Sequence, residues 1–159
     1  MTLKIITDPN PTLRKKADLI EHPLSAGIQA LIPNLIKTMH NDKGIGIAAP
    51  QVGESIRLIV INIKDGPLVL INPKIVAKSI RKEVEEEGCL SVPGVFGMVK
   101  RYKKVKVAAV DQKGEKMTMA GEGLLARVLQ HEIDHLNGIL FTDKIIRKTT
   151  DKAHGEKVL

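Results

Sequence analysis

The chain is poor in aromatic residues, in cysteine and in long apolar runs. Aromatic side chains make up 2% of the sequence, with no tryptophan, one tyrosine and two phenylalanines. Proteins that bind single-stranded nucleic acid stack the bases on aromatic rings, so we expect no dedicated nucleic-acid site. The single cysteine, Cys89, excludes an internal disulfide. No apolar run approaches the roughly 20 residues that span a bilayer, so we expect no membrane partner.

What is present is the composition of a globular domain. Of 159 residues, 43% are hydrophobic and 27% are charged, which is typical of a chain that buries a core. We expect a single catalytic domain over residues 1–159, with its core at about 3–147 and a short C-terminal tail. The first residues, Met1-Thr2-Leu3-Lys4, lack the apolar stretch of a signal peptide, which favours a cytoplasmic location.

The chain carries a formal charge of +7. Such a charge permits a transient contact with an anionic partner such as the ribosome. The basic residues are spread along the chain, with one local cluster between Lys100 and Lys106. Within it, Lys104 to Val107 alternates charged and apolar residues, as on the solvated face of a half-buried strand. The charge therefore permits anionic partners without indicating a nucleic-acid site.

The strongest local signal is His-Glu-Ile-Asp-His at positions 131–135, inside a predicted amphipathic helix. Residues four apart on an α-helix project the same way, because each residue turns the helix by roughly 100°. His131, His135 and Glu132 therefore lie on the apolar arc that also contains Val128. Burying a neutral polar group without partners costs about 2–7 kcal/mol. A metal would offset that cost, because neutral imidazole nitrogens are good ligands.

Ordinary alternatives stay open on the residues alone. A bare H-E-x-x-H occurs by chance in many chains, and buried histidines often bond to backbone carbonyls. A lone cysteine is more often a small buried hydrophobe than a ligand. Arg127 and Gln130 occupy the other side of the helix, and Arg127 either borders a pocket or is solvated.

The hydrophobic pattern predicts strands between two helices. We expect a first helix at about 24–41, although Pro33 fits a first turn better than a helix interior. Asp65-Gly66 indicates a hairpin turn, and Asn137-Gly138 closes the last helix, which opens at Gly121 or Glu122. The predicted loop is 44–53, and the predicted strands are 57–63, 68–71, 74–85, 105–111 and 115–119. A run of strands between helices indicates an α+β fold with a mainly antiparallel sheet.

Three motifs occur in a characteristic order. They are Gly-Ile-Gly-Ile-Ala-Ala-Pro-Gln at 44–51, Glu-Gly-Cys-Leu-Ser at 87–91 and Gln-His-Glu-Ile-Asp-His-Leu at 130–136. Together they resemble the signature motifs of the polypeptide deformylase family, and the resemblance runs over nearly the whole chain. It implies an α+β fold with mixed, mainly antiparallel sheets packed around a central C-terminal helix that carries the H-E-x-x-H motif.

The resemblance implies that Cys89, His131 and His135 bind one divalent metal ion per chain. The family suggests Fe(II), with Zn, Ni or Co also able to occupy the site. A thiolate and two imidazoles leave a fourth tetrahedral position for water, and a metal would deprotonate the thiol. Ordinary H-E-x-x-H peptidases use a downstream Glu or His instead, for which only His154 and Glu156 are available.

The resemblance also implies a reaction, the hydrolysis of the N-formyl group from N-formylmethionyl peptides with release of formate. Glu132 is then the general base and acid. Gln51 and the backbone N–H of Leu90 hold the formyl oxygen as it gains charge, and one such donor typically contributes about 3 kcal/mol. Without the resemblance, Gln51 is a loop-bracing amide and the Leu90 N–H is a ladder donor.

The family binds its peptide antiparallel beside the 44–46 segment, as an added strand. The residues that this implies for substrate binding are Ile45, Gly46, Gly88, Leu124 and Val128. By default, the three aliphatic residues among them are core or cleft-lining positions, and Gly46, like Gly44, is a turn residue.

Two further features bear on the site. Glu87 and Arg101 are expected to form an ion pair that braces the Cys89 loop, the alternative being two exposed charges of little value. The 94–97 segment lacks an arginine that some relatives carry there. The remaining functional alternatives are another metal-dependent amidase or peptidase, and a non-catalytic basic module that binds the ribosome or RNA.

Overall fold

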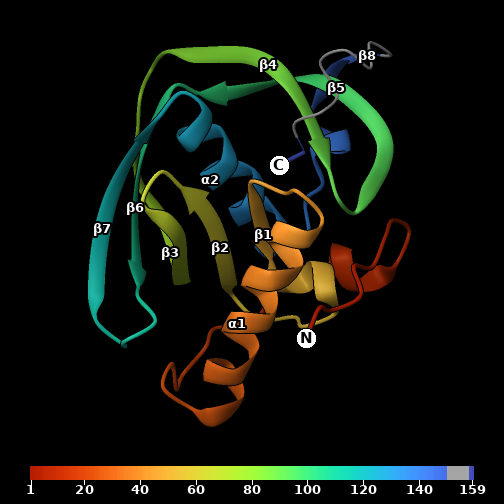
Figure 1. The fold of residues 1–159 in the computed structure, drawn as a ribbon. Helices are drawn as coiled ribbons and strands as arrows, with labels where there is room; N and C mark the ends of the chain where they lie inside the picture. The colour runs from red at the N-terminus through yellow and green to blue at the C-terminus, as the bar shows by residue number, and fades with distance from the viewer. Residues whose placement is uncertain (150–157) are drawn as a thin grey trace.

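The computed structural model describes residues 1–149 and 158–159 (Figure 1). The described residues form two α-helices, eight strands and three short 3-10 helices. The helices are α1 (Ala26–Asn41) and α2 (Leu124–Leu136). The strands are β1 (Gly46–Ala48), β2 (Leu58–Ile63), β3 (Gly66–Lys78), β4 (Lys82–Cys89), β5 (Val92–Tyr102), β6 (Lys104–Val110), β7 (Lys116–Glu122) and β8 (Ile145–Thr149). The 3-10 helices are Pro11–Arg14, Ala49–Val52 and Phe141–Asp143.

The strands form two antiparallel sheets. A five-stranded sheet has the order β1-β2-β3-β6-β7, and a three-stranded sheet has the order β4-β5-β8. Ile63 pairs with Gly66, so Lys64 and Asp65 form the two-residue turn between β2 and β3. Gly66 itself has φ 113°, which favours glycine. The α+β fold with mainly antiparallel sheets is thereby confirmed.

Different helices cover the two faces of the five-stranded sheet. Successive side chains of β2 point to opposite faces, so they pack against different helices. Ile59 and Ile61 join the buried cluster that contains α2 residues, whereas Leu58 and Val60 join the cluster of α1. Each fully buried aliphatic side chain contributes about 1.5–3 kcal/mol to folding. The alternation of one strand therefore holds both helices to the sheet.

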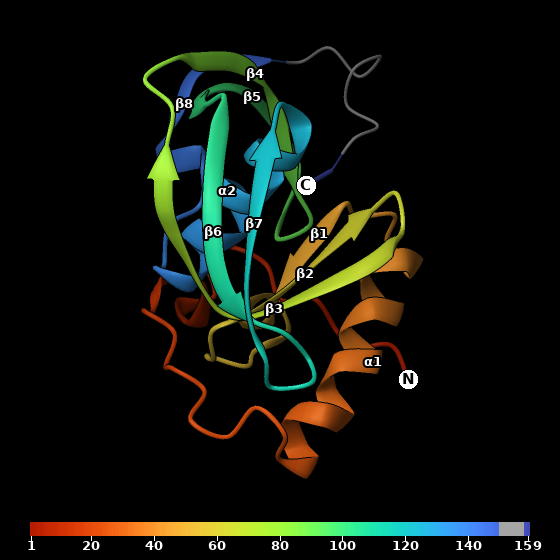
Figure 2. The same ribbon diagram turned by 90° about the vertical axis from the view of Figure 1, so that its left-hand side faces the viewer.

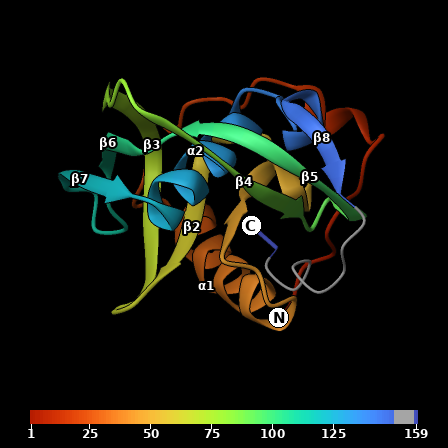
Figure 3. The same cartoon turned by 90° about the horizontal axis from the view of Figure 1, so that it is seen from above.

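Helix α2 is the centre of the molecule. It contacts β1, β2 and β7 of the larger sheet and β5 of the smaller one, and it runs between the two sheets (Figures 1 and 2). Seen from above, β4 and β5 pass over α2 (Figure 3). Because sheets lie on two sides, Arg127 and Gln130 are buried, although their side was expected to be the polar one. Leu124 at the first turn is instead 47% exposed.

Several element boundaries differ from the predictions. Helix α1 begins at Ala26 and contains Pro33 in its interior, because the helix is anchored by buried residues on both sides of the proline. The predicted strand 74–85 is two strands, interrupted at residues 79–81. The predicted 44–53 loop contains β1 and a 3-10 helix, and α2 begins at Leu124 because β7 continues to Glu122.

The C-terminal region also differs from a simple tail. Strand β8 pairs with β5 up to Thr149, and Leu159 is buried in the main cluster. His154 and Glu156, the alternative downstream ligands, lie outside the described residues. Within residues 1–149 and 158–159, no helix has the length and apolar character needed to cross a membrane.

Candidate metal centre

Three metal-ligating side chains meet between the sheets. Cys89 ends β4, and His131 and His135 lie one turn apart on α2. Their ligand atoms all lie within 4.8 Å of one another, and the Cys89 Sγ is 3.4 Å from the His135 Nε2. All three side chains are buried. The helical spacing explains the two imidazoles, and the end of β4 brings the thiol to them.

The protonation preferences of this cluster fit a cation. The Nδ1 of His131 donates to the Glu87 Oε1 at 2.8 Å, which turns its Nε2 towards the cluster. Burial opposes the charged form of His131, but Cys89 and Glu87 outweigh it and raise the pKa of His131 to about 10. Burial and the charge of His131 lower the pKa of His135 well below its usual value. The same negative neighbours that attract a proton to His131 attract a metal ion.

Unpartnered polar atoms support the same interpretation. Among the described residues, the buried nitrogen His131 Nε2 and both carboxylate oxygens of Glu132 have no hydrogen-bond partner. Leaving such groups unpaired costs about 1–3 kcal/mol each. A thiolate and two imidazoles are a donor set for a divalent transition metal, so the residues present fit a metal ion.

Glu132 is a fully buried carboxylate beside the ligands. Burial raises its pKa to about 7, with a smaller contribution from Glu87, while the charges of His131 and Arg101 act in the opposite direction. Gly46 of β1 packs directly against it, because a Cβ on Gly46 would lie 2.8 Å from the Glu132 Oε1. A glycine is therefore required for β1 to pass this close to the carboxylate.

Gln51 is held with its amide nitrogen towards the cluster. Its Oε1 accepts the N–H of Ala48 at 2.9 Å, which fixes the orientation of the amide. Its Nε2 then lies 3.6 Å from the Cys89 Sγ and 3.2 Å from the Ser91 Oγ. Leu90 directly follows Cys89, so its backbone belongs to the same loop. The structure thus brings the donor of Gln51 to the sulfur ligand.

The five residues expected to bind substrate are buried to different degrees. Val128 is buried and Ile45 is partly buried in one hydrophobic cluster, whereas Leu124 is largely exposed. Gly88 precedes Cys89 on β4, and a Cβ there would lie 2.5 Å from a ring carbon of Phe96. These residues therefore come from β1 and the residue before it, from β4 and from α2, whereas the polar groups come from β4, α2 and the 3-10 helix Ala49–Val52.

Glu87 organises the charged side of α2. Its carboxylate pairs with Arg101 at 2.9 Å and with Arg127 at 2.6 Å, and it accepts from His131. Burial opposes its charge, but hydrogen bonds from His131 and Arg101 hold the pKa of Glu87 well below its usual range. Arg127 was expected at a pocket rim or in solvent, but the structure buries it. Its position four residues before His131 places the two side chains on the same side of α2, but that spacing does not show what covers this side.

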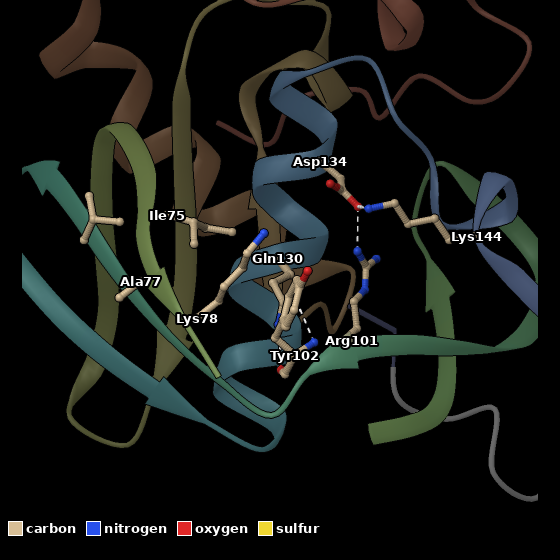
Figure 4. Close-up of a pocket in the computed structure, with 9 residues that line it drawn as sticks. Ile75, Ala77, Lys78, Arg101, Tyr102, Gln130, Asp134 and Lys144 are labelled. Atoms are coloured by element: carbon tan, nitrogen blue, oxygen red, sulfur yellow. Dashed lines mark hydrogen bonds and ion pairs between the residues drawn. The ribbon is translucent and has the colours of Figure 1, made fainter. Parts of the chain in front are cut away.

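The network continues to the surface through Arg101. Its guanidinium also pairs with Asp134 of α2, and Lys144 approaches the same carboxylate at 2.9 Å (Figure 4). These three residues line a surface pocket of about 270 Å³, bordered by Tyr102 and the end of β3 (Figure 4). A chain of ion pairs therefore connects His131 with solvent on the far side of Arg101.

A thiolate and two imidazoles beside a buried carboxylate, held on an α+β scaffold, define the class of metal-dependent hydrolases. The family model described as Polypeptide deformylase matches residues 2–151. A peptide deformylase from Desulfitobacterium hafniense is 48% identical over 89% of this chain and 93% of that relative. The crystal structure of a peptide deformylase from Legionella pneumophila superposes with a TM-score of 0.88 at 45% identity, covering 91% of this chain and 86% of that one.

A peptide deformylase from Synechococcus elongatus in complex with actinonin has a TM-score of 0.87 at 42% identity, covering 90% of this chain and 78% of that one. The chain belongs to the polypeptide deformylase family, whose members are metal-dependent hydrolases.

Proposed function

We propose that this chain hydrolyses the N-formyl group of N-formylmethionyl peptides and acts as a single catalytic domain. Water adds to the formyl carbon, the carbon–nitrogen bond breaks, and formate and a free amine leave. The observation that carries the proposal is the cluster of Cys89, His131 and His135 beside the buried carboxylate of Glu132. Membership of the deformylase family supports it.

We propose one divalent metal ion per chain, bound by Cys89, His131 and His135, with Fe(II) as the native metal and Zn, Ni or Co as substitutes. The donor set accepts all four metals. When bound, the metal supplies a Lewis acid that polarises the formyl oxygen and lowers the pKa of water. Glu87 holds His131 in the tautomer that keeps Nε2 free for the metal.

Glu132 is proposed to move the proton. Its pKa of about 7 populates both the carboxylate and the acid at neutral pH, which suits a group that must first accept and then donate. The carboxylate takes a proton from the attacking water. The acid then gives it to the amine nitrogen as that nitrogen leaves.

Gln51 and Leu90 are proposed to stabilise the oxygen that gains charge. The Gln51 Nε2 already points towards Cys89, and the bond from Ala48 prevents the amide from turning over. A donor fixed before the reaction costs no reorganisation when the charge develops. The N–H of Leu90 would supply the second hydrogen bond.

The peptide is proposed to bind between β1 and the end of β4, with its first side chain against α2. The contacting residues would be Ile45, Gly46, Gly88, Leu124 and Val128. An Acinetobacter baumannii peptide deformylase with Met-Ala-Ser bound has a TM-score of 0.87 to this chain at 35% identity, covering 91% of this chain and 99% of that one. A peptide ligand in a relative of this similarity supports a peptide substrate here.

The test is formate release from formyl-Met-Ala-Ser by anaerobically purified protein, with the metal content of the same sample measured. We expect one metal per chain, rapid release, and loss of release in Glu132→Ala with metal retained. Acetyl-Met-Ala-Ser separates this reaction from that of a broader amidase, because a site built for formyl should exclude the larger acyl group. Full metal without formate release would refute the proposed reaction.

We also propose that the protein works in the cytoplasm and contacts the ribosome transiently. The net charge of +7 supports an anionic partner. Co-sedimentation with ribosomes should weaken steeply as salt is raised from 50 to 200 mM, as for other phosphate contacts. Absence of co-sedimentation at low salt would contradict the ribosome contact and leave the hydrolase proposal unaffected.

A further inference from the structure

The segment Val158–Leu159 lies between the two elements proposed to bind the peptide. The N–H of Ile45 donates to the Val158 carbonyl at 3.1 Å, and the N–H of Leu159 donates to the Gly88 carbonyl at 3.2 Å. Val158 also forms a parallel bridge with Gly44. The C-terminal end of the chain accordingly lies between β1 and the tip of β4 (Figures 1 and 2).

The side chain of Leu159 is part of the core on the substrate side. It is 2% exposed and belongs to the same buried cluster as Val128, against which Ile45 packs. Both residues are proposed contacts of the first substrate side chain. The Leu159 side chain therefore lies where we expect the methionine side chain of a substrate.

The reactive groups are inaccessible in this arrangement. Cys89, His131, His135, Glu132 and Gln51 are each at most 3% exposed. A peptide must reach these groups to be hydrolysed, so part of the structure that covers them has to move. The Ile45 N–H is one donor, and it cannot bond to Val158 and to a substrate carbonyl together.

The direction of the segment distinguishes it from a substrate. Val158 runs parallel to the Gly44 segment, whereas the substrate is expected antiparallel to it. The segment nonetheless uses the backbone groups of Ile45 and Gly88, and because the bridge is parallel, Leu159 follows Val158 in the direction of Ile45 and Gly46. A ligand bound in the reverse direction occupies the site and offers no formyl group.

We propose that Val158–Leu159 is an intramolecular competitive ligand of the peptide-binding site, displaced when a formylated peptide binds. The proposal rests on the proposed function for the identity of the site. It makes the chain bind substrate only in the fraction of molecules from which Leu159 has withdrawn. Apparent substrate affinity falls in proportion to that fraction.

The first experiment compares the full chain with a chain that ends at Lys157, both loaded with zinc. Removing the segment should lower the KM for formyl-Met-Ala-Ser about tenfold, because burial of one Leu side chain biases the equilibrium by that order. The kcat should stay unchanged, since saturating substrate displaces the segment anyway. Leu159→Ala should act in the same direction, and Ile146→Ala, an exposed aliphatic residue on β8, serves as the matched control with unchanged KM.

The second experiment needs no turnover. Amide hydrogen exchange at Ile45, followed by NMR on the zinc protein, should be slow in the full chain and faster once the segment is removed. In trans, acetyl-Gly-Glu-Lys-Val-Leu should inhibit the shortened chain competitively and restore protection at Ile45, whereas the same peptide ending in Ser should do neither. Circular dichroism of each variant checks that the fold is retained.

Either an unchanged or a raised KM in the folded shortened chain would overturn the proposal, as would unchanged exchange at Ile45. Failure of the proposed function gives a different result. In that case neither chain releases formate, while the exchange at Ile45 still reports whether the segment occupies the site.

Discussion

Helix α2 is buried on two sides by different interactions. Towards the five-stranded sheet it presents Leu129 and Leu136, which pack against aliphatic residues of β2 and β6. Towards β4 and β5 it presents Arg127 and His131, which converge on Glu87. On the apolar side the free energy of unfolding depends on the buried volume, so truncating a side chain lowers it according to the number of atoms removed. The charged side depends on complete pairing, because removal of one member leaves the other charges buried without a partner.

Among substitutions on the two sides of α2, loss of Glu87 should have the largest effect on stability and metal affinity. Glu87→Gln leaves Arg127 without an anionic partner and Arg101 with Asp134 alone, and we expect the free energy of unfolding to fall by about 3–5 kcal/mol. Metal affinity should fall about 10–100-fold, because His131 loses its charged acceptor and an amide oxygen accepts more weakly. Urea denaturation and competition with a chelator measure the two effects. Glu85→Gln, an exposed carboxylate on the same strand, should change neither.

The pH dependence gives an independent check on Glu87. Its pKa is depressed in the folded protein, so its charge stabilises the fold above the unfolded-state pKa of about 4.3. That stabilisation is lost as the pH falls through the lower, folded-state value. The stability difference between the natural chain and Glu87→Gln should therefore shrink below about pH 4.3. A difference independent of pH would contradict the role of the charge.

Truncation on the apolar side should be slightly less costly. Leu129→Ala removes a fully buried side chain and should lower the free energy of unfolding by about 3 kcal/mol. Metal affinity should stay within twofold, because Leu129 belongs to the apolar cluster and makes no hydrogen bond to the ligands or to Glu87. Leu19→Ala, at an exposed position, is the control. A loss of metal affinity comparable to that of Glu87→Gln would show that the two sides are not separable.

Gly46 marks the place where the apolar sheet meets the polar cluster. Gly46→Ala would place a Cβ against Glu132 and displace its carboxylate, so kcat should fall about 100-fold, which corresponds to about 2.7 kcal/mol. Steady-state kinetics and metal content on the same sample measure this effect. Gly27→Ala, where a Cβ meets nothing within 4 Å, should keep full activity. Normal turnover in Gly46→Ala would argue against Glu132 as the proton carrier.

The ion pair between Lys144 and Asp134 should contribute least to stability. Lys144 lies at the surface and pairs with Asp134, which Arg101 also satisfies. Lys144→Ala should change the free energy of unfolding by less than about 1 kcal/mol, and less still at high salt. A loss as large as that of Glu87→Gln would mean that the network acts as one unit from the surface to His131.

Local patterns predicted much of this fold. The apolar run of β2, helical spacing in α2 and the left-handed Gly138 at its end are properties of short segments, and the structure has all three. Strand β5 escaped prediction because Pro93, Gly94 and Gly97 interrupt its alternation. Its strand conformation is imposed by pairing with β4 and β8, which no short segment can reveal.

The site residues likewise divide into those that a short segment predicts and those that it does not. Helical spacing placed His131, His135 and Glu132 together, because their neighbourhood is local. Cys89 was joined to them only through resemblance to a family, since 46 residues separate it from His135. The burial of Arg127 depends on which sheet covers that side of α2, so it could not be read from the helix alone.

The N-terminal segment closes on residues near the other end of the chain. The N–H of Ala17 donates to the Leu136 carbonyl at 2.8 Å, Arg14 pairs with Asp143, and a Cβ on Gly138 would collide with the carbonyl of Arg14. The segment that contains Arg14 and Ala17 can therefore make these contacts only after the ribosome has synthesised Leu136, Gly138 and Asp143. Translation from Cys89 to His135 takes about 2–9 s at ordinary elongation rates, and in that interval the thiol has no imidazole beside it. Until His135 has been synthesised, the Cys89 thiol also lacks the burial that it has in the folded protein, so we expect it to be more accessible to oxidants in the nascent chain.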